Sequence, residues 1–156
     1  MTVEREEEMK KKILYLAFDK ATVADIKWIL EDLNLDFEIE AIQTLPQLAD
    51  TLLEEKERII LIVTDTFLPA VKDLAPIGKP EISTLDGFQA GFVILEHFLR
   101  QKGSSYKNIP VLILTAKILT KKEKELVQKL KVEYIELFRS GWRRRFKKFI
   151  TRLSLK

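Results

Sequence analysis

The sequence predicts an α/β protein in which a parallel sheet carries helices on both faces, a doubly wound arrangement. Five short apolar or alternating segments take turns with five segments whose apolar residues recur at helical spacing. Such alternation is typical of βα units, because parallel neighbours need a long connection between them. The most apolar segment, Ile59–Val63, is continuous and rich in β-branched residues, as expected for a strand buried on both faces.

Three strands and two helices are expected in the first half of the chain. Lys12–Phe18 is a short apolar run, and Val23–Leu33 follows it with apolar residues at helical spacing. Phe37–Gln43 alternates apolar and polar residues, which indicates a strand at the edge of the sheet. Leu45–Glu57 is predicted to be a helix, and Arg58–Thr64 is predicted to be the third strand.

The second half opens with Phe67–Leu85, which we expect to be a long irregular loop. It holds three prolines and a glycine, and loops of this length are usually functional or mobile. Right-handed crossovers between all the elements predict the strand order 2-1-3-4-5. The remaining elements are expected at Asp86–Gln101 (helix), Pro110–Leu114 (strand), Thr120–Leu130 (helix), Val132–Leu137 (strand) and Ser140–Leu153 (helix).

Length and composition limit the chemistry of the chain. Its 156 residues suffice for one domain, which we place at 12–156, after a charged N-terminal segment at 1–11. There is no cysteine and one histidine, His97, so thiol chemistry and disulfides are excluded and zinc is not expected. No segment resembles a signal peptide or a membrane span, and we expect a cytoplasmic protein that does not bind a membrane.

Basic residues are concentrated in the last predicted helix. The net charge is +3, but residues 138–156 hold eight Lys or Arg and no acid, so the rest of the chain is net acidic. We expect a solvated surface that faces an acidic neighbour. The functional alternative is an acidic protein partner or, less expected, the phosphate backbone of a nucleic acid. The surface consists of Arg143, Arg144, Arg145, Lys147, Lys148 and Arg152.

The common motifs of α/β enzymes are absent. The sequence contains no GxGxxG, no GxxxxGK[ST] and no GxSxG. Dinucleotide and P-loop phosphate sites therefore lack their glycines, and a Ser–His–Asp triad has no support. We do not expect an enzyme. The notable polar residue is Asp65, which ends the most apolar segment at the edge of the sheet where α/β proteins bind ligands.

Four segments, taken in order, resemble the receiver domain of bacterial and archaeal two-component response regulators. LIVTDTFLP (Leu61–Pro69) is similar to the strand whose aspartate accepts a phosphoryl group. LDGFQAGFVILEHF (Leu85–Phe98) is similar to the helix that follows, which opens with Asp-Gly. IPVLILTAK (Ile109–Lys117) is similar to the strand that ends in Thr-Ala, and VEYIEL (Val132–Leu137) to the last strand.

The resemblance implies a flavodoxin-like, three-layer (βα)5 fold and assigns roles to three residues. Asp65 would be the phosphoacceptor, or a relic that caps or hydrogen-bonds nearby backbone, and of these two we favour the relic. Thr115 would contact the phosphoryl group, or merely end a strand. Tyr134 would be the aromatic residue that changes rotamer on activation, or a packing residue.

Two departures from the family concern charge. Ala17 and Phe18 stand where the family has the acids that hold Mg²⁺, and neither side chain carries an oxygen ligand. Leu137 stands where the family's lysine pairs with the phosphoryl group. Phosphoryl transfer depends on positioning and charge neutralisation, so transfer to Asp65 should be slow. No cofactor is expected; magnesium would bind weakly to Asp19 and Asp65 if the first loop shifts by one residue.

The third departure is an insertion at 70–85, between Pro69 and Asp86. It would cover the pocket, supply Lys72 or Lys79 as a substitute cation, or form a partner-binding surface. We therefore expect a pseudo-receiver that serves two-component signalling as a protein-interaction module. Its partner would be a histidine kinase, a downstream effector or a second copy of the chain. The alternatives are a working phosphorelay receiver with relocated magnesium ligands and, more distantly, a nucleic-acid-associated protein.

Overall fold

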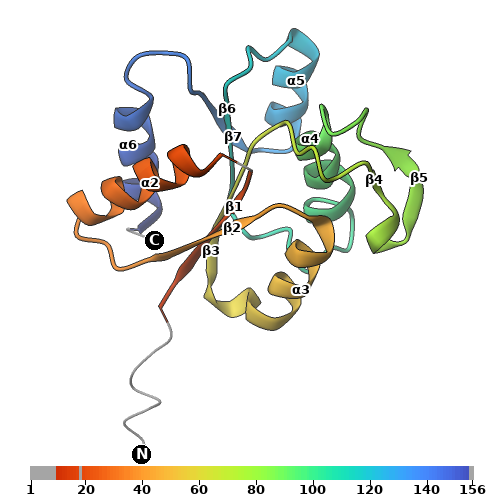
Figure 1. The fold of residues 1–156 in the computed structure, drawn as a ribbon, viewed down its shortest axis with the longest axis horizontal. Helices are drawn as coiled ribbons and strands as arrows, with labels where there is room; N and C mark the ends of the chain where they lie inside the picture. Colours follow the sequence, from red (N-terminus) through yellow and green to blue (C-terminus); the bar gives the residue numbers. More distant parts are fainter. Residues whose placement is uncertain (1–9, 18, 155–156) are drawn as a thin grey trace, which may run out of the picture.

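A five-stranded parallel sheet forms the centre of the molecule in this computed structural model, which describes residues 10–17 and 19–154 (Figure 1). The strands lie in the order β2-β1-β3-β6-β7. This is the predicted order 2-1-3-4-5, since β4 (Asp73–Leu74) and β5 (Lys79–Ser83) form a separate hairpin, and the predicted fold class is confirmed. The strands are β1 (Lys12–Leu16), β2 (Glu38–Ile42), β3 (Ile59–Thr64), β6 (Val111–Thr115) and β7 (Glu133–Glu136).

Helices cover both faces of the sheet, so it is the middle of three layers (Figure 1). The three central strands, β1, β3 and β6, are almost entirely apolar because their alternate side chains enter opposite cores. Tyr15 of β1 packs towards α2 (Lys20–Asp32) and α6 (Trp142–Ser154), whereas Leu14 and Leu16 pack on the other side. The helices are α2 (Lys20–Asp32) and α6 (Trp142–Ser154) on one face, and α3 (Leu45–Glu55), α4 (Ala90–Ile94) and α5 (Lys121–Lys129) on the other.

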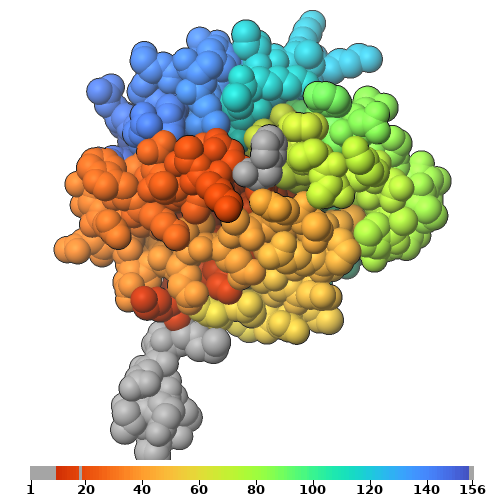
Figure 2. Space-filling model, in the orientation of Figure 1, coloured from red at the N-terminus to blue at the C-terminus, as the bar shows by residue number. Residues whose placement is uncertain are grey.

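The expected irregular loop at Phe67–Leu85 is partly a hairpin, and that prediction was wrong. Strands β4 (Asp73–Leu74) and β5 (Lys79–Ser83) pair antiparallel around a 3-10 turn, η2 (Ala75–Ile77). Proline and glycine mark such turns as well as loops. Leu74 is fully buried and joins the core beneath the hairpin, which lies at one edge of the molecule next to α3 (Figure 2).

The predicted helix at Asp86–Gln101 is shorter and less regular than expected. Leu85, Asp86 and Gly87 all have positive φ, so a tight turn takes the place of the first helical residues. After α4 the chain continues as a π-helix, η3 (Leu95–Leu99). Another small difference is a 3-10 turn, η1 (Lys56–Arg58), at the end of α3.

Two other predictions concern the ends of the chain and the membrane. The acidic block of the segment 1–11 lies outside the described residues. In the part of the chain that the structure describes, no helix combines the length and the apolarity needed to cross a bilayer.

Candidate functional site

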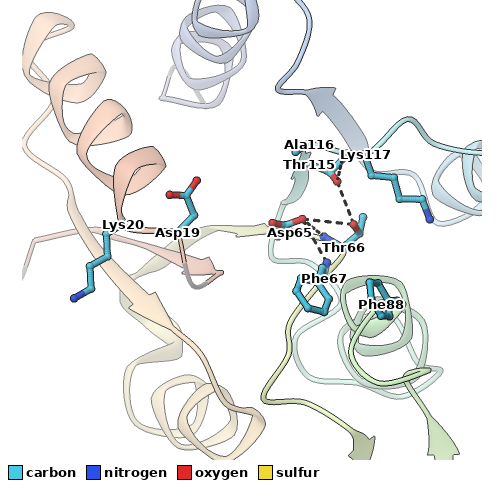
Figure 3. A pocket seen from close by; sticks show the side chains of 9 residues that line it. All are labelled: Asp19, Lys20, Asp65, Thr66, Phe67, Phe88, Thr115, Ala116 and Lys117. Atoms are coloured by element: carbon cyan, nitrogen blue, oxygen red, sulfur yellow. Dashed lines mark hydrogen bonds between the residues drawn. The ribbon is translucent and has the colours of Figure 1, made fainter.

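A cavity of about 650 Å³ opens at the carboxyl end of the central strands (Figure 3). This is the edge where open parallel sheets bind ligands. Segments from four parts of the chain contribute to it: the start of α2, the end of β3, the turn before α4 and the end of β6. The described lining residues are Asp19, Lys20, Asp65, Thr66, Phe67, Phe88, Thr115, Ala116 and Lys117.

Asp65 sits directly after β3 and is anchored by the backbone around it. Its N–H donates to the carbonyl of Leu16 at 2.9 Å, which extends the pairing of β1 with β3. Its Oδ1 accepts a hydrogen bond from the N–H of Thr66 at 2.6 Å and a longer one from the N–H of Phe67 at 3.4 Å. Burial nevertheless raises the pKa of Asp65 above the usual range, because the charged form is poorly solvated.

Two threonine hydroxyl groups lie beside this carboxylate. The Oγ1 atoms of Thr66 and Thr115 are 3.1 Å apart, and Thr115 Oγ1 also accepts a hydrogen bond from the N–H of Lys117 at 3.1 Å. The pairing of β3 with β6 brings the two threonines together. Sequence reasoning named Thr115 but missed Thr66, whose only signal was its place directly after Asp65.

Asp19 serves as the N-cap of α2. Its Oδ1 accepts from the N–H of Ala21 at 2.9 Å, and its Oδ2 accepts from the hydroxyl of Thr22 at 2.6 Å. The hydrogen bond from Thr22 lowers the pKa of Asp19. Figure 3 shows the Asp19 carboxylate across the pocket from Asp65. Both carboxylate oxygens of Asp19 therefore accept hydrogen bonds from the first turn of α2.

The lining residues do not fit a magnesium ion in this arrangement. Mg²⁺ requires near-octahedral oxygen ligands. Ala17 follows the Leu16 carbonyl that pairs with Asp65, and it offers no side-chain oxygen there. Among residues 10–17 and 19–154, no three His, Asp or Glu side chains are grouped so that they could hold a metal. Magnesium binding by Asp19 and Asp65 stays a prediction that requires the loop to move.

The two lysines of the pocket extend away from Asp65 in Figure 3. Lys117 Nζ lies 2.5 Å from Glu123 Oε2 and about 6.0 Å from the ring centroid of Phe92. Glu123 is buried, and the Lys117 ammonium lowers its pKa against the opposing effect of burial. Sequence reasoning did not single out Lys117, although it ends the motif ILTAK.

The suggested substitute cations of the insertion do not line the pocket. Lys79 Nζ donates to the carbonyl of His97 at 3.0 Å and to the side chain of Gln101, so it ties the hairpin to η3. Lys72 is exposed on the hairpin and is not among the described lining residues. Of the three alternatives for the insertion, the structure therefore does not support the one in which either lysine supplies charge to the site, because the hairpin folds against α3 and η3.

An aromatic pair forms one wall of the pocket. The rings of Phe67 and Phe88 are stacked, with centroids 4.8 Å apart and an interplanar angle of 23°. Phe88 is 62% exposed despite this contact. Neither residue was a candidate from the sequence, because a stack between residues 21 positions apart leaves no local pattern.

Tyr134 in β7 and Leu137 directly after it lie in different surroundings. Tyr134 is half-buried beside Val127 of α5, in a surface depression separate from the pocket. The N–H of Leu137 donates to the carbonyl of Thr115 at 2.7 Å, so Leu137 stands next to the site, as the resemblance implies. Its side chain packs into the core under α2 and α6 and brings no charge.

Three of the six basic surface residues of α6 form ion pairs. Arg143 lies 2.9 Å from Asp25, and Lys147 lies 2.5 Å from Asp32, both on α2. Arg152 lies 3.1 Å from Glu133 of β7. Arg144, Arg145 and Lys148 are exposed. The basic surface therefore faces an acidic neighbour, α2, which reduces the charge available to a nucleic acid.

We expect Asp65→Asn to stabilise the fold at neutral pH by on the order of 1 kcal/mol. The amide oxygen can still accept from Thr66 and Phe67, while the poorly solvated charge is removed. Because burial raises the folded-state pKa of Asp65, its penalty is present above that pKa and absent below the pKa of an unfolded aspartate. Thermal unfolding should show a gain at about pH 7 that vanishes near pH 3. Equal Tm values at neutral pH would contradict it.

Comparison with known proteins gives matches among solved structures only. No protein-family model matches the chain, and no curated protein does. The signal receiver domain of a DNA-binding response regulator from Colwellia psychrerythraea 34H is 19% identical, with a TM-score of 0.65 over 94% of this chain and 100% of that one. A two-component response regulator from Legionella pneumophila is 22% identical, with a TM-score of 0.62 over 94% and 100%.

The phosphorylated cyanobacterial phytochrome response regulator RcpA is also similar. It is 19% identical, with a TM-score of 0.58 over 91% of each chain. These likenesses confirm the resemblance found in the sequence at the level of the fold. The chain has the fold of response regulator receiver domains.

Proposed function

We propose that this chain is a single receiver-like domain, at 12–156, that acts in cytoplasmic two-component signalling as a protein-interaction module. Phosphorylation of Asp65 is absent or inefficient, and the domain has no catalytic activity of its own. Its partner is a histidine kinase, a downstream effector or a second copy, bound through the α5–β7–α6 face or the inserted hairpin. The proposal rests on the receiver fold together with the altered charge around Asp65.

The observation that carries this proposal is the environment of the Asp65 carboxylate. It lies beside the hydroxyls of Thr66 and Thr115, as a phosphoacceptor would, yet none of the ion pairs among residues 10–17 and 19–154 brings a Lys, Arg or His to Asp65 to neutralise an incoming phosphoryl group. Ala17 replaces an acid, Leu137 is apolar, and Lys117 is held by Glu123. An incoming anionic phosphoryl group would thus meet the Asp65 carboxylate with little positive charge to offset the two groups.

Phosphorylation can be tested with acetyl phosphate and Mg²⁺, with intact mass as the readout. We expect no adduct on the wild-type chain. The matched positive control is the double variant Ala17→Asp/Leu137→Lys, which returns an acid and a lysine to the positions that the resemblance assigns. This variant should gain a phosphoryl group that is lost when Asp65→Asn is added.

The same measurement separates the alternative functions. Wild-type labelling as fast as that of the double variant, abolished by Asp65→Asn, would overturn the proposal in favour of a working phosphoacceptor. The convergence of Thr66, Thr115 and Asp65 is what favours that alternative. For the nucleic-acid alternative, duplex DNA binding that weakens steeply with salt and with Arg144→Ala/Arg145→Ala would be required.

A further inference from the structure

We propose that the pocket beside Asp65 binds a planar aromatic small molecule that carries a protonated amine, amidine or guanidine group. The cationic group would pair with the Asp65 carboxylate, and the ring would lie against the exposed face of Phe88. This inference goes beyond the proposed signalling role and does not depend on it.

The size and place of the cavity suit a small molecule. Its volume of about 650 Å³ lies within the roughly 300–1,000 Å³ of typical ligand pockets. It opens at the carboxyl ends of β3 and β6, where parallel sheets bind ligands. The fold therefore provides a cavity large enough for a ring system and its substituent.

The wall of the cavity suits an aromatic ring. Phe67 and Phe88 are stacked, and Phe88 still leaves 62% of its surface exposed. A planar ligand that extends this stack would remove apolar surface from water and gain an aromatic contact in addition to burial. The stack faces the same cavity as Asp65, since all three side chains line it (Figure 3).

The negative charge of Asp65 in the cavity favours a cationic ligand over an anionic one. Within residues 10–17 and 19–154, no Lys, Arg or His forms an ion pair with Asp65. Lys20 and Lys117 line the cavity but extend away from Asp65 in Figure 3, and Lys117 is neutralised by Glu123. A bound cation would supply the counter-charge that the partly buried carboxylate lacks.

Two hydroxyl groups beside Asp65 would orient the cationic group of the ligand. The Oγ1 atoms of Thr66 and Thr115 lie 3.1 Å apart beside Asp65, and Thr115 Oγ1 also accepts from the N–H of Lys117. Thr66 retains acceptor capacity whichever of the two hydroxyls donates to the other. An amidinium or guanidinium has several N–H donors in one plane. It can therefore donate to the carboxylate and to a threonine together, while its ring continues towards Phe88.

Three isosteric probes test the proposal by chemical-shift titration of the ¹⁵N-labelled full chain. Benzamidine is a planar cation, benzamide its neutral analogue and benzoate its anionic one. We expect benzamidine to bind with a Kd on the order of 1 mM and to shift the amides of residues 65–67 and 115–117. Benzamide and benzoate should bind at least about tenfold more weakly.

Variants distinguish this site from non-specific binding. Asp65→Asn should abolish the preference for benzamidine over benzamide, and Phe88→Ala should weaken benzamidine at least about fivefold. The matched controls, Asp50→Asn and Phe138→Ala, alter an exposed acid and an exposed aromatic that do not line the cavity and should change nothing. Equal binding of benzamide, a preference that survives Asp65→Asn, shifts confined to other residues, or no binding at 20 mM would overturn the proposal.

Discussion

Gly91→Ala is expected to destabilise the fold by about 3 kcal/mol. Gly91 lies in α4, against the peptide that carries Asp65. A Cβ atom at this position would stand 2.2 Å from the carbonyl oxygen of Asp65 and 3.0 Å from the Cα of Thr66. Both neighbours are backbone atoms, so the helix or the loop after β3 must move. Urea unfolding followed by circular dichroism measures the loss.

Gly103→Ala is the matched control for this substitution. It also replaces glycine by alanine, but nothing lies within 4 Å of the added Cβ. Its cost is limited to the left-handed backbone at φ +83, about 1–2 kcal/mol. If Gly91→Ala is no less stable than Gly103→Ala and leaves the amide signals of residues 65–67 in place, then α4 does not hold the Asp65 loop.

Lys12→Ala is expected to cost about 3 kcal/mol, because it breaks an ion-pair network that joins three elements. Lys12 Nζ on β1 lies 2.8 Å from Glu40 Oε1 on β2 and 2.9 Å from Glu55 Oε1 on α3. Only 7% of the lysine side chain is exposed. Its removal leaves two carboxylates at the base of the sheet with less to neutralise them. Arg58 still pairs with Glu55 at 2.5 Å, which keeps the loss at the lower end of the range for buried pairs.

Lys10→Ala is the comparison that separates burial from charge. Lys10 lies 3.2 Å from Asp36, but both side chains are more than half exposed, and such pairs contribute less than about 1 kcal/mol. Urea unfolding should therefore show a large loss for Lys12→Ala and almost none for Lys10→Ala. Equal losses would mean that the network adds no stability beyond that of a surface pair.

The pH dependence gives a second test of the network. The hydrogen bond from Lys12 lowers the pKa of Glu55. A lowered carboxyl pKa contributes stability above the pKa of an unfolded glutamate, and this contribution is lost as the pH falls through the folded-state pKa. The stability difference between the wild-type chain and Lys12→Ala should thus shrink in acid. A difference that stays constant from about pH 7 to pH 3 would contradict it.

Sequence patterns alone determined the sheet and the position of its candidate site. Apolar spacing records which faces of a segment are buried, and this is a local property. The continuous run before Asp65 could therefore be recognised as a central strand, and the alternating segment at β2 as an edge strand. The resemblance then placed Asp65 and Thr115 at one edge of the sheet, and the structure brings both to one cavity.

Only the tertiary structure decided which side chains line the cavity and which groups they contact. The stack of Phe67 on Phe88 and the contact between the hydroxyls of Thr66 and Thr115 each join segments that are far apart in the sequence. The hairpin likewise depends on the burial of Leu74 and on the contact of Lys79 with His97. Such contacts produce no periodic pattern of apolar residues in the sequence. The residues that make them are close together only after the chain has folded.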